Sequence, residues 1–336
     1  MSSFEKWLYP TPQGLYCEPG NFFIDPLSPV DRALITHGHS DHARRGHSNV
    51  FATYETIEIM KIRYGVECAK SFEVAELGVT NRIGEIDVRF VPAGHILGSA
   101  QIVMEYHHQR VVFSGDYKRS PDPTCLPFEL VPCDLFISEA TFALPVFSHE
   151  PAEREICRLI ESLKRYTNRT HLLGVYALGK CQRMIRLLRD QGYDCPIYLH
   201  NALAPLISLY EKFGIFLGKC VPMGTSKETD LKGALVLCPP SSLEDRWSRR
   251  MGEDPVRVFA SGWMRVRGRA RQRRVELPLV VSDHADWAEL LQTIKEVGAD
   301  EIWVTHGRQD ALIYQLGLMG HRVRGLTLHG YEDEAE

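Results

Sequence analysis

The chain has 336 residues, of which 44% are hydrophobic and 24% are charged, and its formal net charge is −4. This composition is that of a globular protein, and the length suits one large domain or two ordinary ones. The negative net charge predicts no general affinity for polyanions. A nucleic acid would therefore have to be held by a local patch of positive charge or by metal ions.

The nine cysteines are scattered, and no two of them stand at CxxC spacing. This spacing argues against a zinc ribbon and against a thiol redox motif. The beginning, MSSFEKWLYP, has no apolar signal segment, and we find no apolar run of about 20 residues that could span a bilayer. We therefore expect reduced, mostly buried thiols in a cytoplasmic protein.

The first 140 residues predict short strands separated by turns, because β-branched and aromatic runs alternate with Gly, Pro, Asn and Asp. The expected strands are 21–25, 32–36, 49–53, 86–93, 100–106, 110–115 and 134–140. Several of these strands end on a polar side chain, namely Asp25, His37, His95, Asp116 and Glu139. A polar residue at the end of a buried strand is how many α/β enzymes build a site at a sheet edge.

The middle of the chain changes character and predicts an α/β block between about 150 and 265. Apolar residues at helical spacing predict helices over 152–167 and 180–192, with a buried strand at 172–178 between them. After this block, a helix over 288–298 and a strand over 301–307 are expected, and the acidic end, 331–336, is expected to be solvated.

The segment THGHSDH places His37, His39, Asp41 and His42 within six positions directly after an apolar strand. Imidazole and carboxylate groups are good ligands for zinc and related ions. Four ligands on one loop would crowd a single metal ion, so two metal ions are expected. Two metal ions also need a bridging group, for which a carboxylate is the usual choice.

This segment resembles the signature of the metallo-β-lactamase fold, and later clusters resemble further motifs of that fold in the same order. His95 in AGHILGSA resembles the third motif and Asp116 in VFSGDY the fourth, while Asp25 in FFID resembles an acid that orients the metal loop. The resemblance implies that His37, His39, His95 and Asp116 hold one metal ion. It also implies that Asp41, His42, Asp116 and a histidine near the C-terminus hold the other.

The large block between Asp116 and the C-terminal clusters is similar to the insert of the nucleic-acid-processing β-CASP branch of this fold. Glu139 in ISEATF resembles motif A of that branch, His284 in VSDHADW resembles motif B, and His306 in VTHGRQD resembles motif C. The implied fold is α/β, a metallo-β-lactamase αββα sandwich with an inserted β-CASP α/β domain. The metallo-β-lactamase domain would occupy 1–149 and 266–336, and the inserted domain 150–265.

Two features of this resemblance favour different substrates. A histidine at motif C, here His306, is more familiar from members that act on RNA. The whole chain, and above all its beginning at YPTPQGLYCEPGNFFIDP, closely resembles bacterial ligase-associated DNA exonucleases. The second resemblance covers more of the chain. It implies a DNA exonuclease of DNA repair that acts on single-stranded or free-ended DNA, in functional association with an ATP-dependent DNA ligase and a helicase.

The arginine-rich segment MRVRGRARQRR, residues 264–274, is the candidate nucleic-acid contact. Spacing of two residues would place five side chains on one face of an extended strand, namely Arg265, Arg267, Arg269, Arg271 and Arg273. A guanidinium group binds phosphate oxygens bidentately, so this face could lead a phosphate backbone to the metal ions. The alternative is a solvated hairpin whose charge serves solubility.

In the expected mechanism, two divalent metal ions, Zn²⁺ or alternatively Mn²⁺, activate water for attack on a phosphodiester. His284 would protonate the leaving oxygen, Glu139 would orient His284, and Asp41 competes with His284 for the handling of protons. Three other functions stay open, namely an RNA-processing nuclease, a hydrolase of a thioester or lactam, and a catalytically inactive nucleic-acid-binding scaffold.

Overall fold

The computed structural model describes residues 2–223 and 231–326, and its contacts divide the chain into two compact units. Unit 1 comprises Met1–Phe147 and His284–Ala335, and unit 2 comprises Ser148–Asp283. The acidic end at 331–336, for which the sequence predicts a solvated tail, lies outside the described residues. Among the residues described, no helix has both the length and the apolar character needed to cross a membrane.

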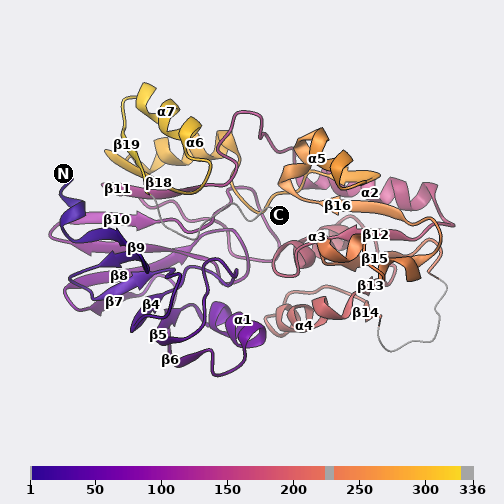
Figure 1. The fold of residues 1–336 in the computed structure, drawn as a ribbon, viewed down its shortest axis with the longest axis horizontal. Coiled ribbons are helices and arrows are strands. Elements are labelled where there is room, and N and C mark those ends of the chain that lie inside the picture. Colours follow the sequence, from indigo (N-terminus) through magenta and orange to yellow (C-terminus); the bar gives the residue numbers. More distant parts are fainter. Residues whose placement is uncertain (1, 224–230, 327–336) are drawn as a thin grey trace. The chain divides into compact units, whose positions relative to one another are not determined.

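The first sheet of unit 1 has the strand order β1-β2-β3-β4-β5-β6 (Figure 1). The first three strands pair antiparallel, and β3 to β6 pair parallel. A short 3-10 turn, η1 (Phe4–Lys6), precedes the sheet, and α1 (Tyr54–Tyr64) connects its last two strands. The strands are β1 (Leu8–Thr11), β2 (Gly14–Cys17), β3 (Phe22–Ile24), β4 (Arg32–Leu34), β5 (His47–Ala52) and β6 (Ala69–Val74).

The second sheet of unit 1 has seven strands in the order β19-β18-β11-β10-β9-β8-β7. The strands from β7 to β10 pair antiparallel, whereas β10, β11, β18 and β19 pair parallel. The strands are β7 (Thr80–Ile83), β8 (Ile86–Pro92), β9 (Ala100–Tyr106), β10 (Gln109–Phe113), β11 (Leu135–Ala140), β18 (Glu301–Gly307) and β19 (Arg322–Gly325). The C-terminal part of the chain therefore completes a sheet that the N-terminal part began.

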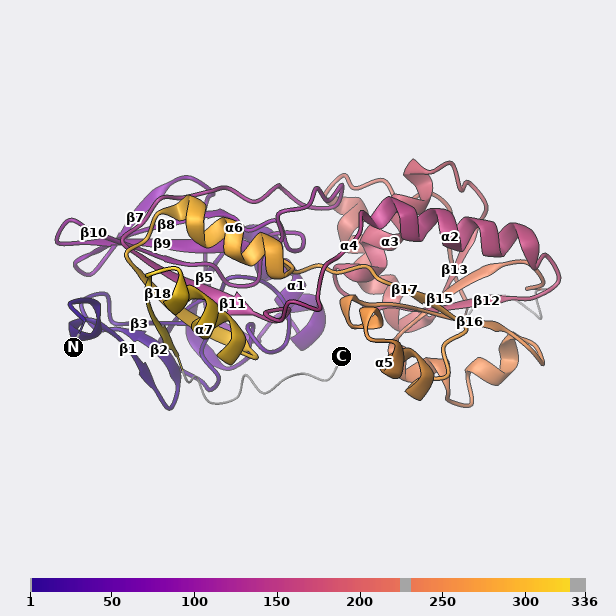
Figure 2. The ribbon, with the colours of Figure 1, turned by 90° about the horizontal axis from the view of Figure 1, so that it is seen from above.

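The two sheets of unit 1 pack face to face through one apolar cluster, in which Leu15 and Phe22 of the first sheet meet Phe90 and Ile102 of the second. The outer face of the first sheet is covered by α1. The outer face of the second sheet is covered by α6 (Trp287–Val297) and α7 (Asp310–Leu318), which Figure 2 shows lying along β18 and β11. Unit 1 is thus an αββα sandwich, which confirms the expected α/β fold class.

Unit 2 contains a parallel six-stranded sheet in the order β14-β13-β15-β12-β16-β17. Its helices are α2 (Ala152–Arg165), α3 (Lys180–Asp190), α4 (Ala204–Lys212) and α5 (Arg267–Gln272). Its short 3-10 turns are η2 (Asn201–Leu203), η3 (Pro240–Leu243), η4 (Ser248–Met251) and η5 (Gly262–Arg265). Its strands are β12 (His171–Gly174), β13 (Ile197–Leu199), β14 (Cys220–Pro222), β15 (Leu235–Cys238), β16 (Val256–Ala260) and β17 (Leu277–Leu279).

Two features of unit 2 differ from what the sequence predicts. The arginine-rich segment is not an extended strand, because residues 262–265 form η5 and residues 267–272 form α5. These two elements pack through Met264 and Ala270 onto the apolar cluster that covers β12 and β16. The sequence predicts that the inserted domain ends at 265. In the structure, residues up to 283 belong to unit 2, because β17 pairs with β16.

Candidate metal centre

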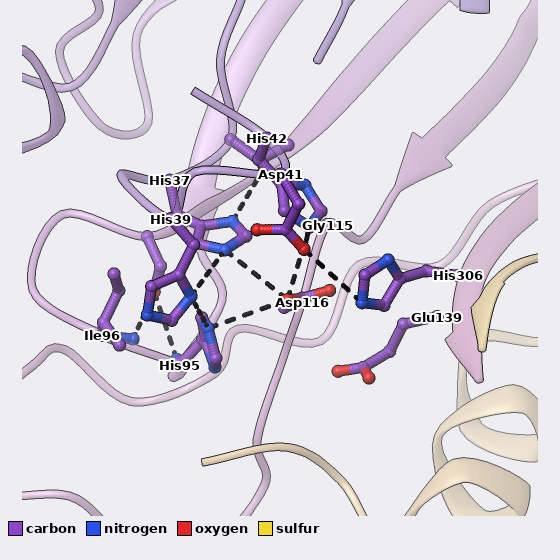
Figure 3. Close-up of polar contacts among 12 residues, drawn as sticks. His37, His39, Asp41, His42, His95, Ile96, Gly115, Asp116, Glu139 and His306 are labelled. Carbon is purple, nitrogen blue, oxygen red and sulfur yellow. Dashed lines mark hydrogen bonds and ion pairs between the residues drawn. The ribbon is translucent and has the colours of Figure 1, made fainter. Parts of the chain in front are cut away.

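The loop after β4 folds the segment THGHSDH into a tight turn. The backbone amides of His42 and Ala43 both donate to the carbonyl of His39, at 3.2 and 2.7 Å. The turn brings the ring of His42 beside that of His37, with the centroids 4.1 Å apart. The histidines and the aspartate of this segment therefore face one small region, which Figure 3 shows.

The first group of possible ligand atoms comes from His37, His39, His95 and Asp116. His39 Nδ1 lies 3.1 Å from His37 Nε2 and 3.0 Å from His95 Nε2. The Oδ2 atom of Asp116 lies 3.5 Å from His37 Nε2 and 3.8 Å from His95 Nε2. The loop after β4, the loop before β9 and the end of β10 thus converge on the same small volume.

The second group comes from Asp41, His42 and His306. Asp41 Oδ2 lies 3.5 Å from His42 Nε2 and 3.8 Å from His306 Nε2. His306 comes from the end of β18 and adopts a positive φ of 53°, which is uncommon for a residue other than glycine. Its side chain is directed toward Asp41 in Figure 3.

Asp116 lies between the two groups. The Oδ2 atom that faces His37 and His95 is also 3.4 Å from His42 Nε2. Gly115 allows this approach, because it has a φ of 55° and a Cβ atom there would lie 2.8 Å from the Cβ of Thr36. A carboxylate in this position can bridge two metal ions.

Without a bound ion, the pKa values of these buried groups shift in different directions, and His42 would have to release its proton to bind a metal ion. Burial, together with the neighbouring His42, holds the pKa of His37 well below its usual value, so its imidazole stays neutral. Burial opposes protonation of His42, but the carboxylates of Asp116 and Asp41 raise its pKa well above the usual value. Burial alone would raise the pKa of Asp116, but His42 and His306 hold it well below the usual value.

The spacing of these atoms fits a bound metal ion. Bonds of about 2.0–2.1 Å in a tetrahedral shell place neighbouring ligand atoms roughly 3.3 Å apart, and the distances between ligand atoms around Asp116 and His39 run from 3.0 to 3.8 Å. The second oxygen of Asp116, Oδ1, is buried without a hydrogen-bond partner among the residues described. A buried polar atom without a partner is costly, and a cation would satisfy it.

Asp25 holds the loop that carries His37 and His42 in place through hydrogen bonds to its carboxylate. Its carboxylate accepts the amide of Thr36 at 2.8 Å, the hydroxyl of Thr36 at 2.6 Å and the Nδ1–H of His42 at 2.7 Å. The Thr36 hydroxyl also lies 3.0 Å from His37 Nδ1. These contacts orient His37 and His42 with their Nε2 atoms toward Asp116, as the carboxylates behind metal-ligating histidines commonly do.

Glu139 and His284 form a buried pair next to Asp116. Both carboxylate oxygens of Glu139 lie near His284 Nδ1, at 3.0 and 3.2 Å. Glu139 also accepts the amide of Tyr117 at 2.8 Å, which fixes the carboxylate. His284 Nδ1 lies 3.8 Å from Asp116 Oδ2, so the pair borders the first ligand group.

All of the metal-ligand candidates named from the sequence lie together in unit 1, as do Asp25, Glu139 and His284. The five candidate arginines lie in unit 2 and do not share one face. Arg269 stacks on the ring of Trp263 at 4.0 Å and Arg273 on that of Phe259 at 4.8 Å. The exposed members are Arg265, Arg267 and Arg271, together with the neighbouring Arg274.

Sequence reasoning did not identify the roles of Thr36 and Ser99. Thr36 links Asp25 to the ring of His37, and the hydroxyl of Ser99 accepts the amides of His95 and Ile96 at 3.1 Å each. The signal for Thr36 is its place directly before the first histidine. Ser99 stands four residues after His95, a spacing that lets a side chain close a short loop onto its own backbone.

No family model matches the chain. A probable DNA ligase of Opitutus terrae is 28% identical over 306 residues, which cover 88% of this chain and 28% of that protein. The YSH1 endoribonuclease of Mycosarcoma maydis is 25% identical and covers 86% of this chain and 42% of its own length. For the ysh1 endoribonuclease of Schizosaccharomyces pombe these values are 25%, 90% and 50%. The chain thus spans half or less of the length of these curated relatives.

One solved structure shares the fold of most of the chain. It is a protein of unknown function from Enterococcus faecalis V583, with a TM-score of 0.56 and 14% sequence identity over 81% of this chain and 74% of the other. This likeness supports the fold, and the sequence relatives support the branch. The chain is a homologue of the Ysh1 endoribonucleases, and its α/β organisation agrees with the β-CASP branch of the metallo-β-lactamase fold that its motifs resemble.

Proposed function

We propose that this chain is a metal-dependent nuclease that hydrolyses phosphodiester bonds in DNA, as an exonuclease of DNA repair. The observation that carries the proposal is the shared position of Asp116. Its Oδ2 atom lies 3.4 Å from His42 Nε2 in one ligand group and 3.5 Å from His37 Nε2 in the other. Two ligand groups that share one carboxylate suit a pair of metal ions and a hydrolytic reaction.

Two divalent ions would occupy these groups. His37, His39, His95 and Asp116 would hold one ion, and Asp41, His42, His306 and Asp116 would hold the other. The set of imidazoles and carboxylates suits Zn²⁺, with Mn²⁺ as the alternative. When bound, such ions supply Lewis-acid stabilisation of phosphoryl oxygens and make water more acidic.

The chain's own residues would handle the protons. Glu139 engages Nδ1 of His284, so the imidazole would exchange a proton with the substrate through Nε2. In its imidazolium form, His284 would protonate the leaving oxygen of the phosphodiester through Nε2–H, and the Glu139 carboxylate would orient the ring and stabilise that protonated form. Asp41 is the competing candidate for proton handling, because its carboxylate borders the second ligand group.

The substrate would be DNA rather than RNA. In support, the relative named probable DNA ligase aligns with 88% of this chain but only 28% of its own length, so the homologous segment is part of a protein named for DNA joining. This match also supports the proposed functional association with an ATP-dependent DNA ligase, and we extend that association to a helicase. The exposed arginines of α5 would contact the phosphate backbone.

An RNA-processing ribonuclease is the second candidate, because the M. maydis and S. pombe relatives are named endoribonucleases. His306 at the second ligand group agrees with this alternative, since a histidine at motif C resembles the members that act on RNA. The two candidates share one metal centre, so only the choice of polymer separates them.

The deciding experiment is digestion of end-labelled single strands of DNA and RNA with the same sequence, at equal salt, while Zn²⁺ or Mn²⁺ is titrated. We expect DNA to be shortened stepwise from one end, with activity that depends on the metal ion. Cleavage of RNA without cleavage of DNA would establish the ribonuclease alternative instead. A chromogenic thioester is included as a control, and its hydrolysis in the absence of any nuclease activity would refute the nuclease proposal.

A further inference from the structure

Lys118 is a fully buried cation beside the metal centre, and the reaction proposed above does not use it. Its side chain is 0% exposed, and that of Asp122 is 3% exposed. Lys118 Nζ donates to Asp122 Oδ2 at 2.5 Å. The other oxygen of Asp122 accepts the amide of Thr124 at 2.8 Å and its hydroxyl at 2.6 Å. Both oxygens of the Asp122 carboxylate are therefore engaged, one by Lys118 and the other by Thr124.

Lys118 also fixes the loop that carries His95. Its Nζ donates to the backbone carbonyl of His95 at 3.4 Å, and its backbone amide donates to the carbonyl of Ala93 at 3.2 Å. Between them, Gly94 has a φ of 75°, and a Cβ atom there would lie 2.4 Å from the carbonyl oxygen of Lys118. The loop thus lies directly on the segment that follows Asp116.

The residue between Asp116 and Lys118 connects the same segment to the Glu139–His284 pair. The amide of Tyr117 donates to Glu139 at 2.8 Å, and the carbonyl of Tyr117 accepts the amide of Ala285 at 2.7 Å. Three consecutive residues therefore contact three parts of the site. Asp116 belongs to the first ligand group, Tyr117 contacts the Glu139–His284 pair, and Lys118 contacts the loop that carries His95. A shift of this tripeptide would move two ligands of the first group relative to each other.

We propose that Lys118 and Asp122 form a positioning pair, which sets the distance between His95 and Asp116 in the first ligand group. A buried ion pair is expensive to desolvate, and well-packed apolar residues would stabilise a fold at least as well. The pair instead fixes the geometry of the site, because the ammonium group of Lys118 binds both the Asp122 carboxylate and the backbone carbonyl of His95, a metal-ligand candidate. Groups behind the ligands of a metal ion typically change its affinity by about 10- to 100-fold.

The test compares the metal affinity of the full chain with that of the double variant Lys118→Met/Asp122→Asn. This variant leaves no buried charge at the pair, and the amide oxygen of the substituted side chain can still accept from Thr124. The single variant Lys118→Met would strand the Asp122 carboxylate and could unfold the chain, so the double variant decides the outcome. Arg119→Met is the matched control, because this neighbouring cation donates to Thr293 and Glu296 instead of the His95 loop.

Two readouts are needed, namely titration with Co²⁺ followed by visible absorption and the melting temperature of the metal-free protein. We expect the double variant to bind the first Co²⁺ about 10- to 100-fold more weakly, with an altered absorption band. Its metal-free melting temperature should stay near that of the wild type, and Arg119→Met should bind Co²⁺ normally. The conservative variant Lys118→Arg keeps the charge and should recover part of the affinity.

An unchanged Co²⁺ affinity and spectrum in the double variant would overturn the proposal, as would a loss of affinity no larger than in Arg119→Met. A lowered metal-free melting temperature with normal Co²⁺ binding would mean that the pair only stabilises the fold. The inference rests on the proposed metal centre, and the wild-type titration tests that centre separately. If the wild type bound no Co²⁺, the metal centre itself would be wrong, whatever the variants did.

Discussion

Glu139 and His284 are 145 positions apart in the chain, yet both carboxylate oxygens of Glu139 lie within 3.2 Å of His284 Nδ1. Glu139 stands in β11, and His284 precedes α6, which begins with the capping box of Asp286 and Glu289. One of the Glu139 oxygens, Oε1, also accepts a hydrogen bond from the amide of Tyr117. The contact therefore fixes both the position of the ring and the nitrogen that carries the proton.

His284→Ala should keep both metal ions and cleave about 10²- to 10⁴-fold more slowly, because it removes a proton donor without removing a ligand. Single-turnover cleavage and metal analysis of the same preparation measure the two quantities. The group formed by Asp116, Glu139 and His284 could itself hold an ion. Metal depletion in His284→Ala would therefore show that His284 is a ligand.

Glu139→Gln provides the matched test of orientation. The side-chain oxygen of the substituted amide can still accept from Tyr117, but its NH₂ group would then face His284 Nδ1 and favour the opposite tautomer. We expect a rate loss of at least about 10²-fold with normal metal content, because the neutral amide no longer stabilises the imidazolium form from which His284 would protonate the leaving oxygen. Activity equal to that of the wild type would mean that Glu139 is a structural residue only.

Asp116→Ala should lose most of its metal and nearly all of its activity, because it removes the atom that both ligand groups share. Metal content after dialysis and cleavage of labelled DNA measure these effects. Asp87→Ala is the control, because Asp87 pairs with Arg82 on the surface at 2.9 Å. Cleavage at the wild-type rate by Asp116→Ala would rule out the dinuclear centre.

The sequence predicts those parts of the site that depend on local order along the chain. His37, His39, Asp41 and His42 share one turn, so their proximity follows from spacing alone. The shared position of Asp116 could only be inferred by resemblance, because it depends on how β10 lines up beside the loop after β4. The predicted αββα sandwich is confirmed, since strands that end on polar residues do form the two facing sheets.

Other elements were missed because tertiary contacts override local patterns. The sequence of α1 contains several β-branched residues and does not predict a helix, yet Ile57 and Met60 pack on the first sheet. The arginine segment reads as a strand at a spacing of two residues. It forms helical turns because Met264 and Ala270 pack on the core of unit 2. In addition, Arg269 and Arg273, which lie one helical turn apart, each stack on an aromatic ring.

Asp25→Asn should weaken metal binding by about 10- to 100-fold, because Asp25 orients the imidazole of His42. Asparagine tolerates the positive φ of 43° at this position, so the fold should persist. Titration against a metal chelator measures the affinity, and we expect the second ligand group to lose its ion first. The control is Asp31→Asn on the exposed surface, and equal losses in both variants would contradict the assigned role.

The arginines of α5 and its C-cap residue Arg273 should separate into two sets. Arg267→Ala/Arg271→Ala should weaken binding to single-stranded DNA and lower the slope of log affinity against log salt by about 1–2, because both residues are exposed and lie one turn apart. Arg269→Ala/Arg273→Ala should instead lower stability by about 1 kcal/mol, because both side chains stack on aromatic rings. Binding by fluorescence anisotropy and unfolding by denaturant test each set. The assignment fails if the stacked pair alone changes the salt slope.

His47 should make stability depend on pH independently of the metal centre. It is 0% exposed, and burial lowers its pKa to about 4, while the amide of Val30 donates to Nδ1 at 3.3 Å. The unfolded chain, with a histidine pKa of about 6.5, binds more protons than the folded chain between pH 6.5 and pH 4. The contribution is therefore complete above about pH 6.5 and is lost as the pH falls toward 4, with a total of about 3 kcal/mol.

His47→Gln isolates this effect, because glutamine does not titrate and its oxygen can still accept from Val30. We expect the difference in unfolding free energy between wild type and variant to shrink as the pH falls from 7 to 4, both proteins being free of metal. Denaturant unfolding at several pH values measures this difference. His321→Gln, at a histidine that is not fully buried, should leave the profile unchanged. A difference that stays constant across this range would mean that folding does not change the proton affinity of His47, in conflict with its burial beside Val30.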